Sequence, residues 1–314
     1  MTTLLPFRLT PEYRDYVWGG RRLRPDQPRT AEAWIVSELD RIQDGPYADW
    51  TLAETAERLG VELLGSVPFQ RTGSRFPLLI KLLDCAGWLS LQVHPNNEQA
   101  VKLEGKGQFG KTEAWHILQN EPGASLLCGL RAGTSSEQLA EAIRQGKIVE
   151  HMERLEAQKG DTIFIRAGTI HALGPGLLLY EVQQTSNLTY RVYDWDRPAT
   201  SERPLHIDKS LAVADPTATG KAIPLPSLKD GQPVEIAKCE YFTLEVLVGQ
   251  ERTAFLSPAG RSFHALTIIE GEAVAEGPGW SQKLGLYETL LIPASVPAYR
   301  IEPRGAYKAL AAHV

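Results

Sequence analysis

Three short segments of the chain carry side chains that could bind a metal ion. Gln92 and His94 lie two residues apart, as do Lys111 and Glu113, and His171 follows a turn at Gly168. Side chains two residues apart on a β-strand point to the same face. These segments together offer one amide oxygen, one carboxylate and two imidazoles. Such a set suits a borderline divalent ion such as zinc, with a coordination position left open for a substrate.

The segments that carry these side chains have the alternation typical of strands. Within residues 88–94, Gln92 and His94 share one face, while Leu91 and Val93 lie on the other. Runs of this kind, bounded by Gly, Pro, Asn or Asp, predict strands. In the first two thirds of the chain the predicted strands are 76–83, 88–94, 112–118, 125–130, 161–166, 177–184 and 188–193.

Helical patterns are fewer. Thr51 and Glu54 have the spacing of a capping box, which predicts a helix over residues 51–60. A second helix is expected over residues 135–144, and a third over residues 148–158. The chain is therefore mainly β with added helices.

Residues 222–233 are rich in proline, glycine and charge and are typical of a linker. Short alternating strands follow, at 241–248, 262–270, 284–293 and 298–302. Short strands separated by glycine and proline turns favour jelly-roll barrels. We expect a larger catalytic domain with helical insertions over residues 1–235, and a small all-β domain without metal ligands over residues 236–314.

Composition limits the function classes. The chain has 314 residues, 43% hydrophobic and 23% charged, which is typical of a soluble globular protein. Its net charge of −5 argues against nucleic acid as the main partner. Three widely spaced cysteines indicate a reduced, cytoplasmic compartment. No secretory signal and no membrane-spanning run is expected, and the protein is a monomer or a homodimer.

Residues 160–172, GDTIFIRAGTIHA, resemble the second motif of the cupin superfamily, with Arg166 where that motif usually has proline. Read in order, five segments resemble type I mannose-6-phosphate isomerases: WGG at 18–20, FPLLIK at 76–81, LSLQVHP at 89–95, KTEAW at 111–115 and AGTIHA at 167–172. The resemblance is strongest over residues 13–200, and QVHP and KTEAW are its most specific parts. Residues 31–37, AEAWIVS, are a loose version of a further family block.

This resemblance implies a metal site and a set of pocket residues. The implied ligands of one zinc ion per chain are Gln92, His94, Glu113 and His171. The implied catalytic residues are Lys111, Arg191 and Glu181, and the implied substrate-binding residues are Ser90, Lys111 and Arg191. The implied partner is a small phosphorylated sugar, and the implied reaction moves a proton between two carbons through an enediol(ate).

Structural roles are the alternatives for these residues. Lys111 could be a solvated strand residue, and Arg191 could form a salt bridge with Asp194 or Asp196. Glu181 interrupts an apolar strand, so it is either functional or paired with an arginine. The remaining histidines are expected to be structural or at the surface: His116, His151, His206, His264 and His313.

The leading hypothesis is a zinc-dependent isomerase that interconverts mannose 6-phosphate and fructose 6-phosphate. An iron-dependent cupin oxygenase is less favoured, because Gln92 stands where such enzymes commonly have a second histidine. A non-catalytic sugar-binding or regulatory cupin with a structural metal is the other alternative, since zinc sites with four protein ligands are usually structural. Native metal, sugar range and the identity of the proton shuttle stay open at this point.

Overall fold

The structure is a computed structural model that describes residues 4–198, 200 and 203–314. Its contacts divide the chain into two compact units. The first unit comprises residues 1–12, 34–80 and 225–314, and the second comprises residues 13–33 and 81–224. Every metal ligand expected from the sequence belongs to the second unit. The expected domain boundary after residue 235 stays a prediction.

Most strands of the second unit lie in two sheets, in which strands far apart in sequence are neighbours. One sheet has the order β14-β10-β7-β12-β5-β3-β2 and the other β13-β6-β11-β8-β9. The first is built from β2 (Glu12–Arg14), β3 (Glu32–Val36), β5 (Leu78–Cys85), β7 (Glu113–Asn120), β10 (Thr162–Ile165), β12 (Leu177–Gln184) and β14 (Ala222–Ile223). The second is built from β6 (Leu91–Val93), β8 (Ser125–Leu130), β9 (Met152–Glu156), β11 (His171–Leu173) and β13 (Tyr190–Tyr193). The chain passes from one unit to the other within β3 and β5.

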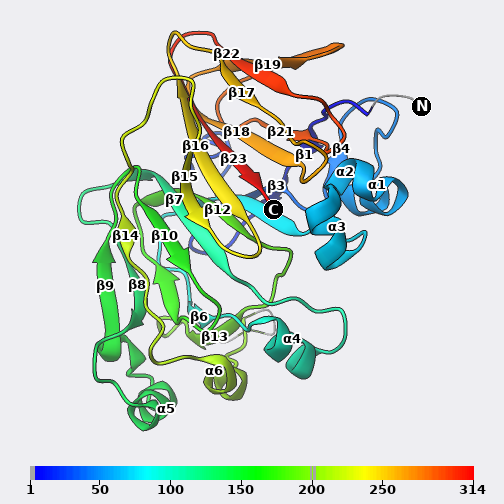
Figure 1. Cartoon of the computed structure of the whole chain (residues 1–314). Coiled ribbons are helices and arrows are strands. Elements are labelled where there is room, and N and C mark those ends of the chain that lie inside the picture. Colours follow the sequence, from blue (N-terminus) through cyan, green and yellow to red (C-terminus); the bar gives the residue numbers. More distant parts are fainter. Residues whose placement is uncertain (1–3, 199, 201–202) are drawn as a thin grey trace. The chain divides into compact units, whose positions relative to one another are not determined.

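The two faces of the β6-containing sheet have different partners. Cys128 and Leu173 lie in a buried cluster with Trp115 and Ile117 of the other sheet. Leu91 and Val93 lie in a second cluster with apolar residues of the helices. This cluster is covered by α5 (Ser136–Arg144) and α6 (Ile207–Val213), which lie side by side beneath the strands in Figure 1. The alternation of residues 88–94 therefore directs Gln92 and His94 between the sheets.

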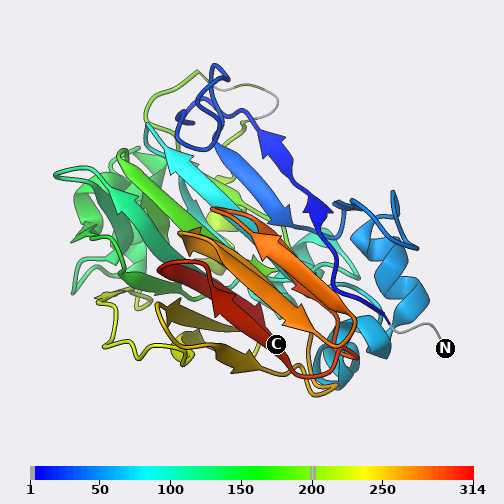
Figure 2. The same ribbon diagram turned by 90° about the horizontal axis from the view of Figure 1, so that it is seen from above.

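The first unit holds the C-terminal strands as two sheets with a shared apolar core. The sheets have the orders β15-β16-β23-β18-β21 and β17-β22-β19-β20. Their strands are β15 (Val234–Lys238), β16 (Thr243–Gly249), β17 (Ala254–Leu256), β18 (His264–Glu270), β19 (Ala273–Gly277), β20 (Trp280–Leu284), β21 (Thr289–Ile292), β22 (Tyr299–Pro303) and β23 (Tyr307–His313). Leu266 and Ile301, from different sheets, belong to one buried cluster. The orange and red strands β18, β21 and β23 run side by side in Figure 2. The expectation of cupin-type jelly rolls is confirmed.

The first unit also contains the N-terminal elements β1 (Leu9–Thr10), β4 (Arg41–Ile42), α1 (Leu52–Leu59), α2 (Val61–Leu64) and α3 (Ser66–Thr72). The capping box of α1 is present, because Thr51 and Glu54 each accept a hydrogen bond from the other's backbone amide. The helix expected at 135–144 is α5, with a further capping box from Ser135. No helix in the described part of the chain is long and apolar enough to cross a membrane.

The helix expected over residues 148–158 is wrong. The chain makes a short 3-10 turn, η1 (Ile148–His151), and then continues as strand β9. Strand β9 pairs antiparallel with β8, with Leu126 opposite Leu155. The weak helical preference of this segment is overridden by an available strand edge.

Candidate metal centre and active site

Two histidines and one glutamate meet between the sheets of the second unit. The Nε2 atom of His171 lies 3.2 Å from Oε1 of Glu113, and Nε2 of His94 lies 3.7 Å from the same oxygen. Their possible ligand atoms all fall within 4.8 Å of one another, and all three side chains are buried. Among the described residues, this is the group of histidine, cysteine and acidic side chains able to hold a metal ion.

Backbone carbonyls fix the orientation of both imidazoles. Nδ1 of His94 lies 2.8 Å from the carbonyl of Leu188, and Nδ1 of His171 lies 3.0 Å from that of Thr169. A carbonyl only accepts, so each Nδ1 carries the hydrogen and each Nε2 presents a lone pair to the centre. Hydrogen bonds of this kind commonly orient metal-binding histidines.

Gln92 approaches the same centre from the strand next to His171. The two residues are cross-strand partners, and Nε2 of the Gln92 amide lies 3.2 Å from Nε2 of His171. The amide nitrogen donates to the lone pair that a metal would take. A half-turn of the carboxamide exchanges its nitrogen for its oxygen, which is a metal ligand. The end of the Gln92 side chain thus lies where a fourth ligand is needed.

Burial controls the charges of the centre. It lowers the pKa of His171 to about 4 and holds the pKa of His94 well below its usual value. Burial also raises the pKa of Glu113 to about 7, although the ammonium group of Lys111 opposes this. Both carboxylate oxygens of Glu113 are buried, and the ammonium group of Lys111 lies 2.9 Å from Oε2. Neutral imidazoles and an undersolvated carboxylate are the donor set that a divalent cation would stabilise.

A chain of buried ion pairs adjoins the centre. Nζ of Lys111 lies 2.9 Å from Glu113 and 3.6 Å from Glu181, and Nζ of Lys81 lies 3.4 Å from Glu181 and 3.7 Å from Glu32. Burial alone would raise the pKa of Glu181, but Lys81 and Lys111 bring it below its usual value. Burial likewise opposes the charge of Lys81, yet Glu181 and Glu32 raise its pKa. The alternative of a solvated Lys111 is wrong, since this side chain is buried.

The sequence interpretation missed Lys81 and Glu32, and it expected an arginine as the structural partner of Glu181. Both lysines instead lie beside Glu181. The signal for Lys81 was present: it is the single charge within the apolar run 76–83. A charge in the middle of a fully buried strand needs a partner or a role.

A cavity of about 440 Å³ opens beside the ion pairs, and residues of the second unit alone form its walls. Its wall includes Lys81, Gln92, Lys111 and Glu181, together with Ser90. Further cationic and polar residues on the wall include Arg191, Arg203, His206, Asn187 and Thr189, and two carboxylates, Asp15 and Glu32, line it as well. The residues expected from the sequence to contact a substrate all line this one cavity.

Arg191 is brought to the cavity by strand register. It is the cross-strand partner of Gln92, which is in turn the partner of His171. The guanidinium donates to the carbonyl of Pro204 at 2.9 Å, and its Nε is buried without a hydrogen-bond partner. The alternative of a salt bridge to Asp194 is not what the structure has. The Asp194 carboxylate instead accepts from two other arginines, Arg197 and Arg203.

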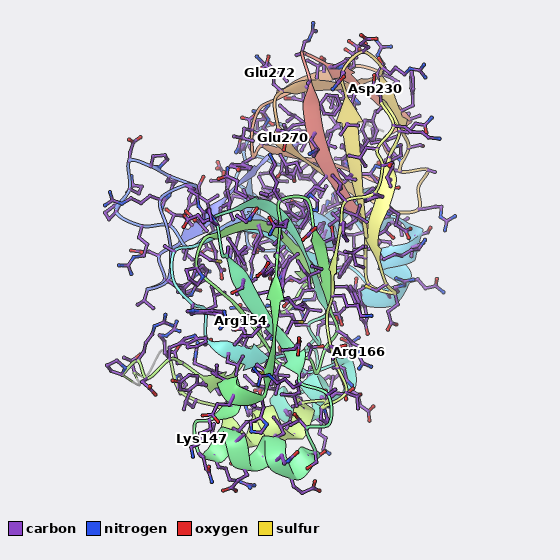
Figure 3. All side chains as sticks on the ribbon, turned by 90° about the vertical axis from the view of Figure 1, so that its left-hand side faces the viewer. Lys147, Arg154, Arg166, Asp230, Glu270 and Glu272 are labelled. Atoms are coloured by element: carbon purple, nitrogen blue, oxygen red, sulfur yellow. The ribbon has the colours of Figure 1, made fainter. Side chains whose placement is uncertain are left out.

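The turn before His171 keeps its conformation despite the arginine. Gly168 has φ +88°, its amide donates to the carbonyl of His94, and its carbonyl accepts from Asp215. Arg166 is exposed and forms an ion pair with Asp215 at 2.8 Å (Figure 3). A side chain that points to solvent at this position leaves the hairpin and the metal ligands undisturbed.

The other histidines fall into two groups. His116 is buried and bonded to Thr162, as expected of a structural residue, and His264 is paired with Tyr299. The expectation that His206 is an ordinary surface residue is wrong, because it is half-buried and lines the cavity. It lies two residues after Pro204 in an irregular segment, so no periodic pattern marks it in the sequence.

Two histidines and one carboxylate that could hold a metal ion, inside a jelly-roll structure, are typical of proteins of the cupin type. The chain matches the family described as phosphomannose isomerase type I, catalytic domain, over residues 6–157. The mannose-6-phosphate isomerase ManA of Bacillus subtilis is 31% identical over 316 residues, covering 96% of either chain. A mannose-6-phosphate isomerase of Streptococcus mutans is 37% identical over 221 residues, which are 66% of this chain and 67% of that one. The chain belongs to the type I phosphomannose isomerase family.

Solved structures agree with this assignment. The crystal structure of the Bacillus subtilis mannose 6-phosphate isomerase matches with a TM-score of 0.85 at 29% identity, over 99% of this chain and 100% of that one. A putative mannosephosphate isomerase from Archaeoglobus fulgidus has the same fold, with a TM-score of 0.79 at 23% identity, over 99% and 98% of the two chains.

Proposed function

We propose that the protein is a zinc-dependent isomerase that interconverts mannose 6-phosphate and fructose 6-phosphate. The observation that carries this proposal is a cavity with two buried lysines and a buried glutamate on its wall, directly beside a metal centre. Family membership supplies the reaction and the substrate class. The acids and bases of the cavity supply the groups that the reaction needs.

The proposed zinc ligands are His94, His171, Glu113 and the oxygen of Gln92. Both imidazoles are neutral and present Nε2 inward, which is the protonation state that zinc requires. A bound zinc ion supplies Lewis-acid stabilisation of the oxygens on the two reacting carbons.

The ion-pair chain supplies the proton chemistry. Glu181 lies within reach of two ammonium groups, at 3.4 Å from Lys81 and 3.6 Å from Lys111. A proton added to its carboxylate neutralises a buried charge, and the lysines hold it ionised before the reaction. We propose Glu181 as the shuttle that carries the proton between C2 and C1, with Lys111 donating to a substrate oxygen.

Arg191 and Ser90 bind the substrate away from the reacting carbons. Arg191 lines the cavity and its guanidinium offers charged donors to an anionic oxygen, and Ser90 lines the same cavity. A fixed cation at this place also offsets negative charge that develops on the substrate.

Two measurements test the proposal. Purified protein is analysed by mass spectrometry for bound metal and is then assayed with mannose 6-phosphate and added zinc. We expect about one zinc ion per chain and formation of fructose 6-phosphate. Absence of product from a protein that demonstrably holds zinc rejects the isomerase.

Arg191→Ala separates an enzyme from a non-catalytic sugar-binding protein. We expect turnover to be abolished, with zinc content and melting temperature nearly unchanged, because Arg191 contacts no metal ligand atom within the described structure. Arg166→Ala is the matched control, since it removes an exposed arginine outside the cavity. Full activity in Arg191→Ala would favour the binding protein or a different catalytic group.

A further inference from the structure

The cavity has a second end, and His206 lies there in a constrained geometry. The backbone amide of His206 donates to the carbonyl of Arg191 at 2.8 Å. The backbone amide of Arg191 donates back to Nδ1 of the His206 ring at 3.1 Å. His206 thus lies beside Arg191, at the end of the cross-strand row that Arg191, Gln92 and His171 form.

This contact fixes the tautomer of the ring. Because a backbone amide is a donor only, Nδ1 of His206 accepts and carries no hydrogen. The hydrogen of the neutral ring therefore sits on Nε2. Burial, together with the charges of Arg191 and Lys209, also lowers the pKa of His206, while Glu104 opposes this. The ring stays neutral and has one fixed donor left, and His206 forms part of the cavity wall.

The row separates two kinds of chemistry along the cavity. At the His171 end lie the metal ligands and the Glu181 ion pairs, where the reacting carbons must bind. At the His206 end lie the guanidinium groups of Arg191 and Arg203, each with N–H groups beyond those that donate to Pro204 and Asp194. Strands lie about 4.8 Å apart, so the two strand steps from His171 to Arg191 span about 10 Å, and His206 lies one hydrogen-bonded step further. An open-chain sugar with an anion at its far end fits that separation.

The charge at the outer end favours an anion. Arg191 and Arg203 carry two positive charges, and the Asp194 carboxylate near them is engaged by Arg203 and Arg197. Asp15 also lines the cavity but is exposed and paired with Arg29 at 3.7 Å. A phosphate group here would gain charged donors from the arginines and a directed neutral donor from the imidazole.

We propose that His206 is a substrate-binding residue that donates one hydrogen bond from Nε2 to the phosphate of the sugar, held in that tautomer by the Arg191 amide. This rests on the proposed function for the identity of the substrate. The role differs from that of Arg191, which supplies charge, because a neutral donor of fixed direction recognises the position of the phosphate oxygens.

Two amide substitutions separate donation from positioning. The amide of Gln reaches the place of Nε2 and can donate, whereas the amide of Asn reaches the place of Nδ1 and can accept from Arg191. We expect His206→Asn to raise KM for mannose 6-phosphate between about tenfold and a hundredfold, the range for a hydrogen bond to a charged group, with kcat little changed. His206→Gln should recover most of that loss.

A purely structural His206 would give the opposite order. His206→Asn would then behave as wild type, and His206→Gln would lower kcat because the strand that carries Arg191 would shift. Either of these results overturns the proposal.

Binding of inorganic phosphate provides a readout without turnover. We expect phosphate to bind the wild-type holoprotein in calorimetry, and its Kd to rise in His206→Asn by the same factor as KM. An unchanged phosphate Kd would overturn the phosphate assignment even if the protein is an active isomerase. Phosphate binding that depends on His206 in a protein without isomerase activity would instead reject the proposed function and keep this site.

Discussion

Zinc binding should be coupled to the release of a single proton, from Glu113. At pH 6 a carboxyl with a pKa of about 7 is about 90% protonated, while a histidine with a pKa of about 4 is neutral. Zinc requires the ionised carboxylate and the neutral imidazoles. Binding at pH 6 should therefore release about 0.9 proton per zinc, and binding at pH 8 about 0.1.

The affinity for zinc follows from the same pKa values. Between pH 8 and pH 5, protonation of Glu113 should weaken binding about 100-fold. Two histidines and a glutamate with ordinary pKa values would weaken it about 1000-fold over this range and would release about 1.5 protons at pH 6. The two cases differ because burial has already removed the protons of His94 and His171.

Calorimetry in buffers of different ionisation enthalpy counts the protons, and competition with a chromophoric chelator gives the affinity. Glu113→Gln is the control, because it removes the titrating group: its zinc affinity should be weaker and nearly independent of pH from 5.5 to 8. Release of more than one proton near pH 6, with a midpoint near pH 6.5, would refute the argument that burial sets the protonation of the histidines.

Three further substitutions test the stability of the fold, one beside the site and two in the first unit. Lys81→Met should lower the free energy of unfolding by about 3–5 kcal/mol in chemical denaturation, because Glu32 and Glu181 lose a buried partner. The control Lys147→Met, at an exposed lysine, should change this free energy by less than about 0.5 kcal/mol. Equal effects of the two substitutions would contradict the ion-pair argument. Burial lowers the pKa of His264 to about 4, so as the pH falls from about 6.5 to 4 the unfolded chain binds a proton there that the folded chain does not, and stability is lost. His264→Phe should remove about 3 kcal/mol of that loss. A melting temperature with the same pH dependence in the variant and the wild type would contradict this prediction. Thr51→Ala should cost about 1 kcal/mol through loss of the α1 cap, whereas Thr51→Ser should cost much less.

Local pattern was enough to predict the parts of the site that lie on regular strands. The alternation of residues 91–94 predicts that Gln92 and His94 lie between the sheets. In the structure Leu91 and Val93 are buried in the cluster with the helices, and His94 lies with Glu113 and His171. The strands 125–130 and 177–184 were predicted with the bounds that the structure has. The helix α4 (Asn97–Glu104) was missed although Asn96 and Gln99 form a capping box that the sequence displays. The signal for this helix is local, so the sequence alone was sufficient to predict it.

Other features depend on partners that are distant in sequence. Residues 148–158 look helical in isolation, and only the exposed edge of β8 makes Met152–Glu156 a strand. Lys81 is a single charge in an apolar run until β3 and β12 place Glu32 and Glu181 on either side of it. The energy of such a residue is set by groups that no window of sequence contains.

Strand register sets the order of the residues along the proposed site, and no local sequence pattern reveals that register. His206, Arg191, Gln92 and His171 come from four separate segments, and hydrogen-bond pairing alone sets their order. A slip of one residue in β13 against β6 would turn Arg191 to the side occupied by Leu91 and Val93. Such a slip is opposed by Tyr190 and Val192, which are buried in the apolar cluster that α5 and α6 cover. The apolar residues of β13 therefore hold its cation in the cavity, and the packing that makes the fold also places the proposed substrate-binding groups in line with the proposed metal ligands.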